Sequence, residues 1–401
     1  MNPTGQRIIA FLLIVFGLFI GSGYAVLIAL ADNRSEATDE WGTLAGFGLF
    51  TGMVGVFWLV LTFRQSGEPA PSFRLPPAWL SLFVFLLLVG AGFGLQLMDR
   101  AVYLAPLLAV LAFGAVAAFF LRIAARWMPE KALMIRNIAW PGAWGVFIAP
   151  MLLIAVQGGA VVLMAIGLFA GIVAENPDFE IDPNLEDRIS NYLEESDSGA
   201  TSTELPEIVE SPTVALMLFS LVAVIAPLSE ELVKAAGAII LLSRRPSVTR
   251  ADAFQAAVAA GLGFAIFEGI GYTLAAPSSW QQLILVRAPV VIMHVAATTI
   301  VVLGWHRMRE TGRGFIPYFA AGVVLHAGWN ALAVGFVYSL TGIESGSDPS
   351  TAQALAILAV VLILGALFFL AVGWFVSAAR KAGESVRPVS PAYGPIGAVP
   401  V

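Results

Sequence analysis

Residues 213–242 read TVALMLFSLVAVIAPLSEELVKAAGAIILL, an apolar segment that contains the group Ser-Glu-Glu-Leu-Val-Lys at positions 229–234. A helix rises about 1.5 Å per residue, so about 20 apolar residues cross the roughly 30 Å hydrocarbon core of a bilayer. A helix is required here because lipid offers no partner for backbone N–H and C=O groups. The segment therefore predicts a transmembrane helix with Glu230, Glu231 and Lys234 in its interior.

The composition indicates that the whole chain, not only this segment, belongs to a membrane protein. Of 401 residues, 59% are hydrophobic and only 12% are charged, whereas soluble domains carry roughly 25% charged residues. So little charge cannot cover a water-soluble surface of this size, and no nucleic-acid partner is expected. The sequence contains no cysteine, which excludes disulfides and thiolate metal ligands. A bound metal would have to use His, Glu or Asp.

The apolar runs predict the fold class, an all-α polytopic transmembrane helix bundle of about ten spans. Each run is long enough to cross a bilayer as a helix, so we expect the bundle to be embedded in the lipid bilayer. The spans are expected at 8–30, 41–63, 78–98, 102–121, 143–173, 213–242, 252–276, 283–305, 316–341 and 352–378.

The basic residues predict the orientation. In the ten-span topology, 16 of the 21 Lys and Arg residues fall on one side and 3 on the other, namely Arg34, Arg100 and Arg188. The other two, Lys234 and Arg287, lie within spans. Cytoplasmic loops of membrane proteins carry an excess of Lys and Arg. We therefore expect a multi-pass protein of the cell membrane with both termini in the cytoplasm.

The same pattern suggests five regions. Residues 1–173 form an N-terminal membrane region of about five spans, and 174–212 form an acidic extracytoplasmic loop. The loop contains 12 acidic residues and one basic residue, which indicates a solvated segment, or else a cap over a site. Residues 213–341 form a bundle of four spans, 342–382 the final span, and 383–401 a disordered tail.

Ionisable side chains inside the predicted spans are the main anomaly. Spans one to five and ten have almost none, whereas spans six to nine contain seven. A charge at the centre of a bilayer costs a few kcal/mol, so such residues usually face a cavity, pair with each other and mark a function. Their concentration in four consecutive spans predicts one shared site, formed by Glu230, Glu231, Lys234, Glu268, Arg287, His294 and His326.

Helix geometry is consistent with one polar layer. Glu230 and Lys234 are four residues apart and share a helix face, with Glu231 beside them. Counted from the basic ends of the spans, Glu230, Glu268, His294 and His326 lie at depths of roughly 15–24 Å. Antiparallel neighbouring helices can therefore bring these groups together near the middle of the membrane.

These residue types suit peptide hydrolysis in two ways. A buried glutamate can act as a general base while His and Asn donate hydrogen bonds to the oxyanion. Alternatively, one Glu and two His can hold Zn²⁺, which lowers the pKa of its bound water to about 7. The residues alone permit both schemes.

The segment 229–234 matches the E-E-x-x-K motif of the PrsW family of intramembrane proteases, which is related to the CAAX prenyl proteases. Phe267-Glu268-x-x-x-Tyr272 resembles the second motif of that family. Arg287, Pro289 and His294 resemble the third, and His326-Ala327-Gly328-Trp329-Asn330 resembles the fourth, H-x-x-W-N. The resemblance covers 225–332, about a quarter of the chain, and the order and spacing of all four motifs fit.

The resemblance implies a role for each residue. Glu230 would activate water, with Glu231 and Lys234 supporting it, and His326 and Asn330 would hold the oxyanion or the base. Glu268 and His294 would complete the site, with Tyr272 and Arg287 in support. If a metal is bound, the expected ligands are Glu268, His294 and His326. Related enzymes are described both as zinc peptidases and as metal-free glutamate proteases, so Zn²⁺ is one of two options. The implied substrates are membrane-anchored proteins such as anti-sigma factors.

Other interpretations compete with this one. Intramembrane Glu, His and Lys also build proton relays, which would make the chain a proton-coupled transporter, and a non-catalytic scaffold is a further alternative. Tyr272 could be an interfacial aromatic, and Arg287 could extend toward the membrane surface. The third histidine, His306, is expected to be solvated in a basic loop.

Overall fold

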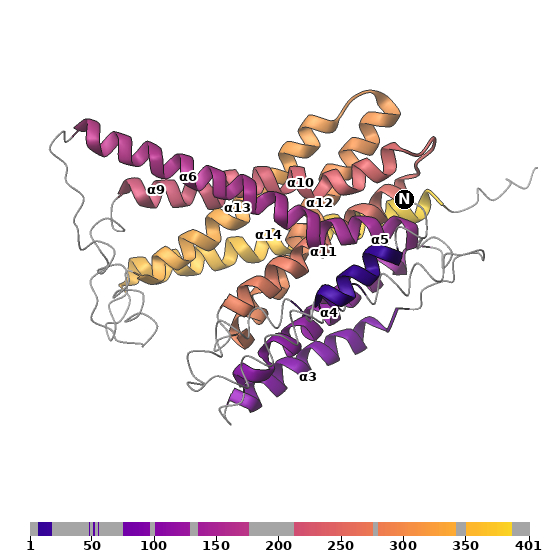
Figure 1. Cartoon of the computed structure of the whole chain (residues 1–401), viewed down its shortest axis with the longest axis horizontal. Coiled ribbons are helices and arrows are strands. Elements are labelled where there is room, and N and C mark those ends of the chain that lie inside the picture. Colours follow the sequence, from indigo (N-terminus) through magenta and orange to yellow (C-terminus); the bar gives the residue numbers. More distant parts are fainter. Residues whose placement is uncertain are drawn as a thin grey trace, which may run out of the picture.

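In the computed structural model the chain folds as a bundle of helices (Figure 1). The structure describes residues 7–17, 48, 51–52, 55, 75–96, 101–128, 135–175, 212–275, 280–341 and 350–386. Within these ranges the regular elements are all helical, which confirms the all-α class, and 7 helices are long and apolar enough to cross a membrane. Two shorter apolar helices, Arg7–Gly17 and Ala78–Gly94, accompany them.

The labelled helices follow the expected order along the chain. They are α3 (Ala78–Gln96), α4 (Ala101–Arg126), α5 (Ile135–Ala143), the π-turn η1 (Trp144–Ile148), α6 (Ala149–Glu175), α9 (Pro212–Ser220), the π-turn η2 (Leu221–Ile225), α10 (Ala226–Ser243), α11 (Arg250–Ala275), α12 (Trp280–Thr311), α13 (Phe315–Thr341) and α14 (Thr351–Glu384).

Each predicted span from 78 onward has a helix at its position. The main differences are longer helices: α12 and α14 continue past residues 305 and 378, and α5–η1–α6 starts ahead of residue 143. Most of the first two predicted spans, the loop residues 176–211 and the tail residues 387–401 lie outside the described residues. The count of ten spans, the membrane sidedness and the acidic loop therefore stay predictions.

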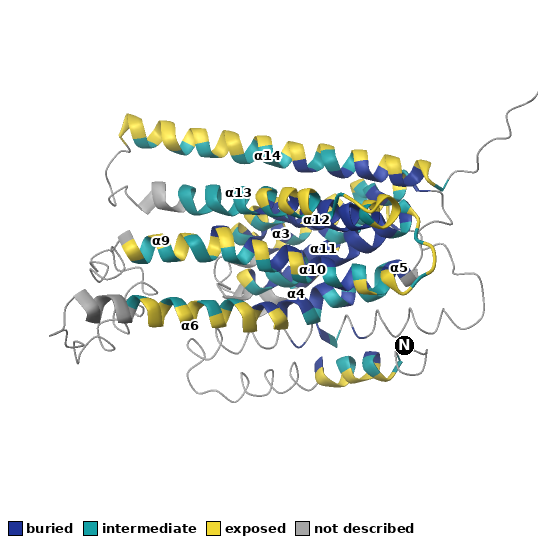
Figure 2. Cartoon of the chain, turned by 90° about the horizontal axis from the view of Figure 1, so that it is seen from above, coloured by how far each residue is buried: buried dark blue, intermediate teal, exposed yellow. Residues whose placement is uncertain are grey.

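Helices α11 and α12 form the centre of the bundle (Figure 2). The buried share of their membrane-spanning stretches is 83% and 67%, against 6% in α14 and 11% in α13. Small residues allow this close packing: a Cβ atom added at Gly261 of α11 would lie 2.9 Å from the Cα of Val295 in α12. The outer helices leave their apolar faces for lipid.

Two π-turns occur in the same local sequence. Trp144–Ile148 is followed by Ala149-Pro150, and Leu221–Ile225 is followed by Ala226-Pro227. In each case the alanine N–H bonds to the carbonyl five residues earlier, and the next residue is a proline without an N–H. The π-turns therefore begin α6 and α10, the neighbouring helices at one edge of the polar site.

Hydrogen bonds close one end of the bundle, where α10, α12 and α14 end and α11 begins. The Arg309 guanidinium donates to the carbonyls of Leu242, Arg245 and Pro246, so it caps α10. Thr249 and Asp252 exchange side-chain and backbone bonds that start α11.

The third histidine also belongs to this end of the bundle. The expectation that His306 is solvated was wrong, because it is 3% exposed and its Nε2 lies 3.1 Å from the Val248 carbonyl. Long α12 continues past the predicted span end and carries the ring into the packed end of the bundle.

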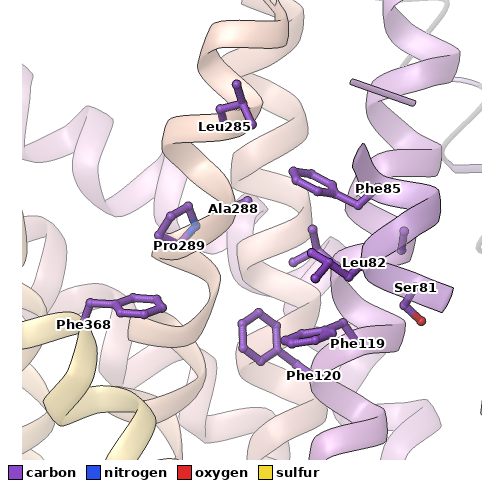
Figure 3. Close-up of a pocket in the computed structure, with 11 residues that line it drawn as sticks. Ser81, Leu82, Phe85, Phe119, Phe120, Leu285, Ala288, Pro289 and Phe368 are labelled. Atoms are coloured by element: carbon purple, nitrogen blue, oxygen red, sulfur yellow. The ribbon is translucent and has the colours of Figure 1, made fainter. Parts of the chain in front are cut away.

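An apolar pocket of about 230 Å³ lies among α3, α4, α12 and α14 (Figure 3). Its lining includes Phe85, Phe120, Pro289 and Phe368. On α12, Pro289 and His294 are separated by about 140° around the helix axis. The pocket therefore faces a different direction from the polar site described next.

Candidate active site

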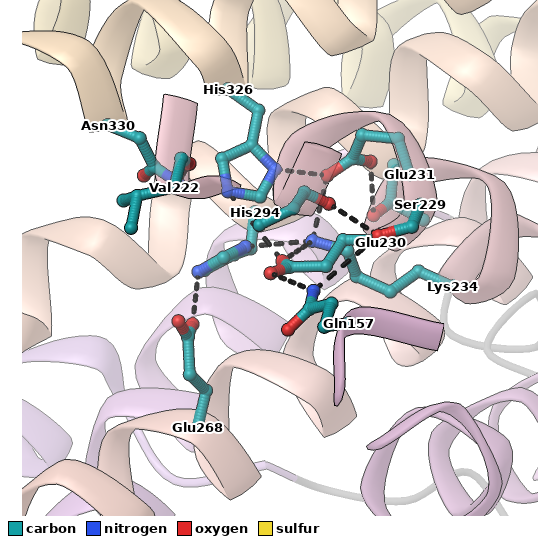
Figure 4. A network of polar contacts seen from close by, with 12 residues as sticks. Gln157, Val222, Ser229, Glu230, Glu231, Lys234, Glu268, His294, His326 and Asn330 are labelled. Atoms are coloured by element: carbon teal, nitrogen blue, oxygen red, sulfur yellow. Dashed lines mark hydrogen bonds and ion pairs between the residues drawn. The ribbon is translucent and has the colours of Figure 1, made fainter. Parts of the chain in front are cut away.

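Helix α10 supplies the centre of a buried polar cluster (Figure 4). The Lys234 ammonium lies 3.1 Å from Oε2 of Glu230 and 2.8 Å from Oε1 of Glu231. It also lies 2.9 Å from Nδ1 of His294 and 4.3 Å from the centre of the Phe264 ring. Lys234 and Glu231 are fully buried and Glu230 is 6% exposed. Charges this far from water must be paired, and here each one is.

Helix α13 brings His326 to Glu231. Nδ1 of His326 and Oε1 of Glu231 are 2.9 Å apart, and because a carboxylate only accepts, Nδ1 donates. In the neutral form of the ring Nε2 would be the acceptor, and it lies 3.7 Å from Oε2 of Glu230. The second oxygen of Glu231 accepts a 3.1 Å hydrogen bond from Thr298. Glu231 is therefore fully engaged in holding Lys234 and His326.

Helices α11 and α12 provide a second carboxylate–imidazole pair. Oε2 of Glu268 lies 2.6 Å from Nε2 of His294 and 2.6 Å from the Arg287 guanidinium. An ammonium only donates, so Nδ1 of His294 accepts from Lys234 and the proton of the neutral ring is on Nε2. Arg287 also lies 4.4 Å over the ring of Tyr272. Arg287 thus points to Glu268 instead of extending toward the membrane surface.

The two pairs converge on Glu230. Ligand atoms of Glu230, His294 and His326 all lie within 4.8 Å of one another, and the His294 and His326 rings are 4.8 Å apart. One carboxylate and two imidazoles form a donor set typical of Zn²⁺. Histidine ligands of metals usually donate their other N–H to a carboxylate, and both rings here face one. The donor set therefore fits a metal.

The three residues whose ligand atoms converge differ in one member from the predicted ligand set of Glu268, His294 and His326. Glu230 lies with the two histidines, whereas Glu268 lies behind the His294 ring, at the nitrogen opposite Lys234. The sequence could not distinguish these two glutamates, because both lie at similar depth in adjacent spans. Charge also favours a cation here, since Glu230, Glu231 and Glu268 outnumber Lys234 and Arg287.

The side chain of Asn330 is turned to the backbone of η2. Its Nδ2 donates to the carbonyl of Val222 at 3.0 Å. The N–H of Ala226 bonds to Leu221, and the next residue, Pro227, has no N–H to offer Val222. The amide of Asn330 therefore satisfies a carbonyl that the proline leaves without a helical donor, and it joins α13 to the start of α10.

Three contributors were not identified from the sequence. Thr298 bonds to Glu231, Phe264 packs against Lys234 and His294, and Gln157 of α6 donates to Oε1 of Glu230 at 3.4 Å. A signal for Gln157 was present, because it is the one amide side chain in the apolar segment 149–174. Threonine and phenylalanine are common in membrane helices, so their positions carried no comparable signal.

Access to the cluster differs from one side to the other. His294 and His326 are each 1% exposed, whereas the side chains of Glu268 and Arg287 are 22% and 18% exposed. Tyr272, next to Arg287, is 51% exposed. The cluster is therefore buried at Glu231 and Lys234 and reaches the surface along Glu268, Arg287 and Tyr272.

Comparison with known proteins agrees with this geometry. Residues 200–367 match a family model described as PrsW family intramembrane metalloprotease. No curated protein and no solved structure matches the chain. The matched range contains all four helices that supply the carboxylates and imidazoles of the cluster, and the family supports a membrane peptidase and a metal. Over residues 200–367 the chain is therefore similar to the PrsW family of intramembrane metalloproteases.

Proposed function

We propose that this chain hydrolyses peptide bonds of membrane-anchored proteins and that residues 213–341 form its catalytic bundle. The observation that carries the proposal is the convergence of Glu230 with His294 and His326, each ring backed by a separate carboxylate. Such an arrangement fixes the orientation of both imidazoles before a substrate arrives. Preorganised polar groups in a water-poor site are the main source of catalytic power in many enzymes.

Without a metal, Glu230 is the general base. It removes a proton from water, the water oxygen bonds to the carbonyl carbon, and the proton passes to the amine nitrogen as the C–N bond breaks. Lys234 supplies a positive charge close to the reacting groups. Its ammonium contacts Glu230, Glu231 and His294, which supports this form of the reaction.

With a metal, Glu230, His294 and His326 are the residues that would hold it. Zn²⁺ bound there would polarise the scissile carbonyl and lower the pKa of its water to about 7. Nδ1 of His294 would then exchange its contact with Lys234 for the ion, because Nε2 faces Glu268. Glu231 and Glu268 would hold the two rings from behind. Glu230 is essential in both forms.

The residues on the exposed side of the cluster have supporting roles in this proposal. Arg287 fixes Glu268 against His294, and Tyr272 stacks on Arg287. Asn330 fixes the start of α10 through the Val222 carbonyl, so a shift of η2 would free its amide for an oxyanion. For the substrate class, the PrsW resemblance favours membrane-anchored regulatory proteins of the anti-sigma-factor type.

Cleavage in liposomes tests the proposal. Wild type and Glu230→Gln are reconstituted with a membrane-anchored candidate substrate, and product is followed by mass spectrometry. We expect cleavage by wild type and a loss of at least about 10³-fold in Glu230→Gln. Glu310→Gln is the matched control, because Glu310 is 61% exposed and lies outside the cluster. Wild-type cleavage by Glu230→Gln would refute the proposal, and proton flux without cleavage would favour a transporter.

A further inference from the structure

We propose that Gln157 of α6 is a positioning residue that fixes the carboxylate of Glu230, an inference that rests on the proposed function. Gln157 lies outside residues 200–367, the range that matches the PrsW family model. The active site would therefore be completed by a helix of the N-terminal membrane region. That region would then have a direct part in the reaction.

The contacts show how the carboxylate is held. Nε2 of Gln157 donates to Oε1 of Glu230 at 3.4 Å and to Oγ of Ser229 at 3.5 Å (Figure 4). Oε2 of Glu230 accepts from Lys234 at 3.1 Å. One donor on each oxygen fixes the rotation of the carboxylate plane. With that plane fixed, Oε2 stays directed at the space next to Nε2 of His326, 3.7 Å away.

Packing explains why Gln157 faces the site. Leu153, one turn earlier on α6, is 3% exposed and packs in a cluster with Ala149, Phe264 and Val233. Residues four apart share a helix face, so the face of α6 that carries Leu153 also directs Gln157 toward α10. Nearby Trp144 donates to the Val233 carbonyl at 2.8 Å and fixes the start of α6 against α10.

The chemistry of an amide suits this place. The cluster already contains three carboxylates and the two basic side chains of Lys234 and Arg287. Another cation at position 157 would form an ion pair with Glu230 and make it a weaker base. A neutral amide orients the carboxylate without cancelling its charge. An amide facing lipid with no partner would cost several kcal/mol, so the polar contact, not the apolar surroundings, accounts for its presence in α6.

Two isosteric variants test the proposal. Gln157→Met keeps the length of the side chain and removes the donor, and we expect kcat to fall roughly 10- to 100-fold, the usual effect of removing a group that orients an active-site residue, with KM unchanged. Gln157→Glu removes the donor and adds a negative charge beside Glu230, so its kcat is expected to fall further. Gln281→Met is the matched control, because Gln281 is buried but donates to the Gly92 carbonyl. It is expected to lower thermal stability and leave kcat intact.

The outcomes separate this inference from the proposed function. Wild-type kcat in Gln157→Met, or a higher KM with unchanged kcat, would overturn the positioning role. If wild type cleaves no better than Glu230→Gln, the proposed function fails. A thermal-unfolding cycle of Gln157→Met and Glu230→Met, which removes both acceptor oxygens, tests the contact without activity. Non-additive midpoint shifts would support the contact. Additive shifts would overturn it.

Discussion

Nδ1 of His326 donates to Oε1 of Glu231 at 2.9 Å, between side chains that are 1% and 0% exposed. The pair explains how two adjacent glutamates on one helix have different tasks. Both oxygens of Glu231 are engaged, one by Lys234 and His326 and the other by Thr298. Glu230 lies beside both histidines, with its Oε2 3.7 Å from Nε2 of His326. In the proposed mechanism the first glutamate of the pair is therefore the reactive one, and the second orients the imidazole.

Replacing the orienting carboxylate tests this division of tasks. We expect Glu231→Gln to lower kcat about 10²- to 10⁴-fold, because an amide can present an N–H to His326 and favour the wrong tautomer. Thr298→Val removes the 3.1 Å bond to the other oxygen and keeps the shape, so a smaller loss of about tenfold is expected. Steady-state cleavage rates in liposomes give both values. Equal losses in the two variants would contradict the assignment.

The link between Asn330 and Val222 makes a prediction about stability. Asn330→Ala leaves the Val222 carbonyl without its donor, at a cost of about 1–3 kcal/mol. Pro227→Ala supplies the missing N–H, so the same Asn330→Ala change should cost much less in that background. Unfolding of the four proteins in mild detergent measures the coupling. A cost that is the same in both backgrounds would show that the proline is not the reason for this hydrogen bond.

Metal binding predicts a pattern among the three histidines. Elemental analysis after zinc loading is expected to find one zinc per chain in wild type and substoichiometric zinc in His294→Ala and His326→Ala. His306→Ala is the matched control, since His306 is buried at the end of the bundle beside Val248. Zinc retained by His294→Ala and His326→Ala would refute the site formed with Glu230. Full activity in zinc-free wild type would favour the metal-free reaction.

The cap on α10 predicts an effect on stability without an effect on chemistry. Arg309 donates to three carbonyls where α10 ends, and Arg309→Ala is expected to destabilise the protein by about 1–2 kcal/mol. Arg313→Ala removes an exposed arginine just after the end of α12 and should change stability little. Thermal unfolding in detergent compares them. Equal midpoints in the two variants would show that the cap contributes nothing.

The elements that could be predicted from the sequence are the long apolar helices, whose formation is required by the lipid. Long apolar segments must form helices in a bilayer. For the spans from residue 78 onward, most of the predicted helix ends therefore lie within a few residues of the observed ones. Ends were missed where polar residues continue a helix beyond the apolar run, as at 306–311 of α12. The π-turns were not predicted, because their signal is only a proline two residues after each turn.

For the site, the sequence identified the residues better than it identified which of them contact each other. Ionisable groups in membrane helices are costly, so Glu230, Glu268, His294 and His326 were conspicuous, and the structure brings all four together. Which glutamate meets which imidazole depends on helix rotation and tilt, which the spacing along one helix does not determine. Gln157 was not predicted, because one neutral amide in an apolar helix costs less than a charge and is a weaker signal.

The most direct test of the central claim is a double-mutant cycle on single-turnover cleavage in liposomes. Glu230→Gln and His326→Ala are compared alone and together, with a membrane-anchored substrate. If the two groups act as one unit, the double variant is no slower than the slower single variant. Losses that multiply, or cleavage by Glu230→Gln at the wild-type rate, would contradict a shared catalytic site.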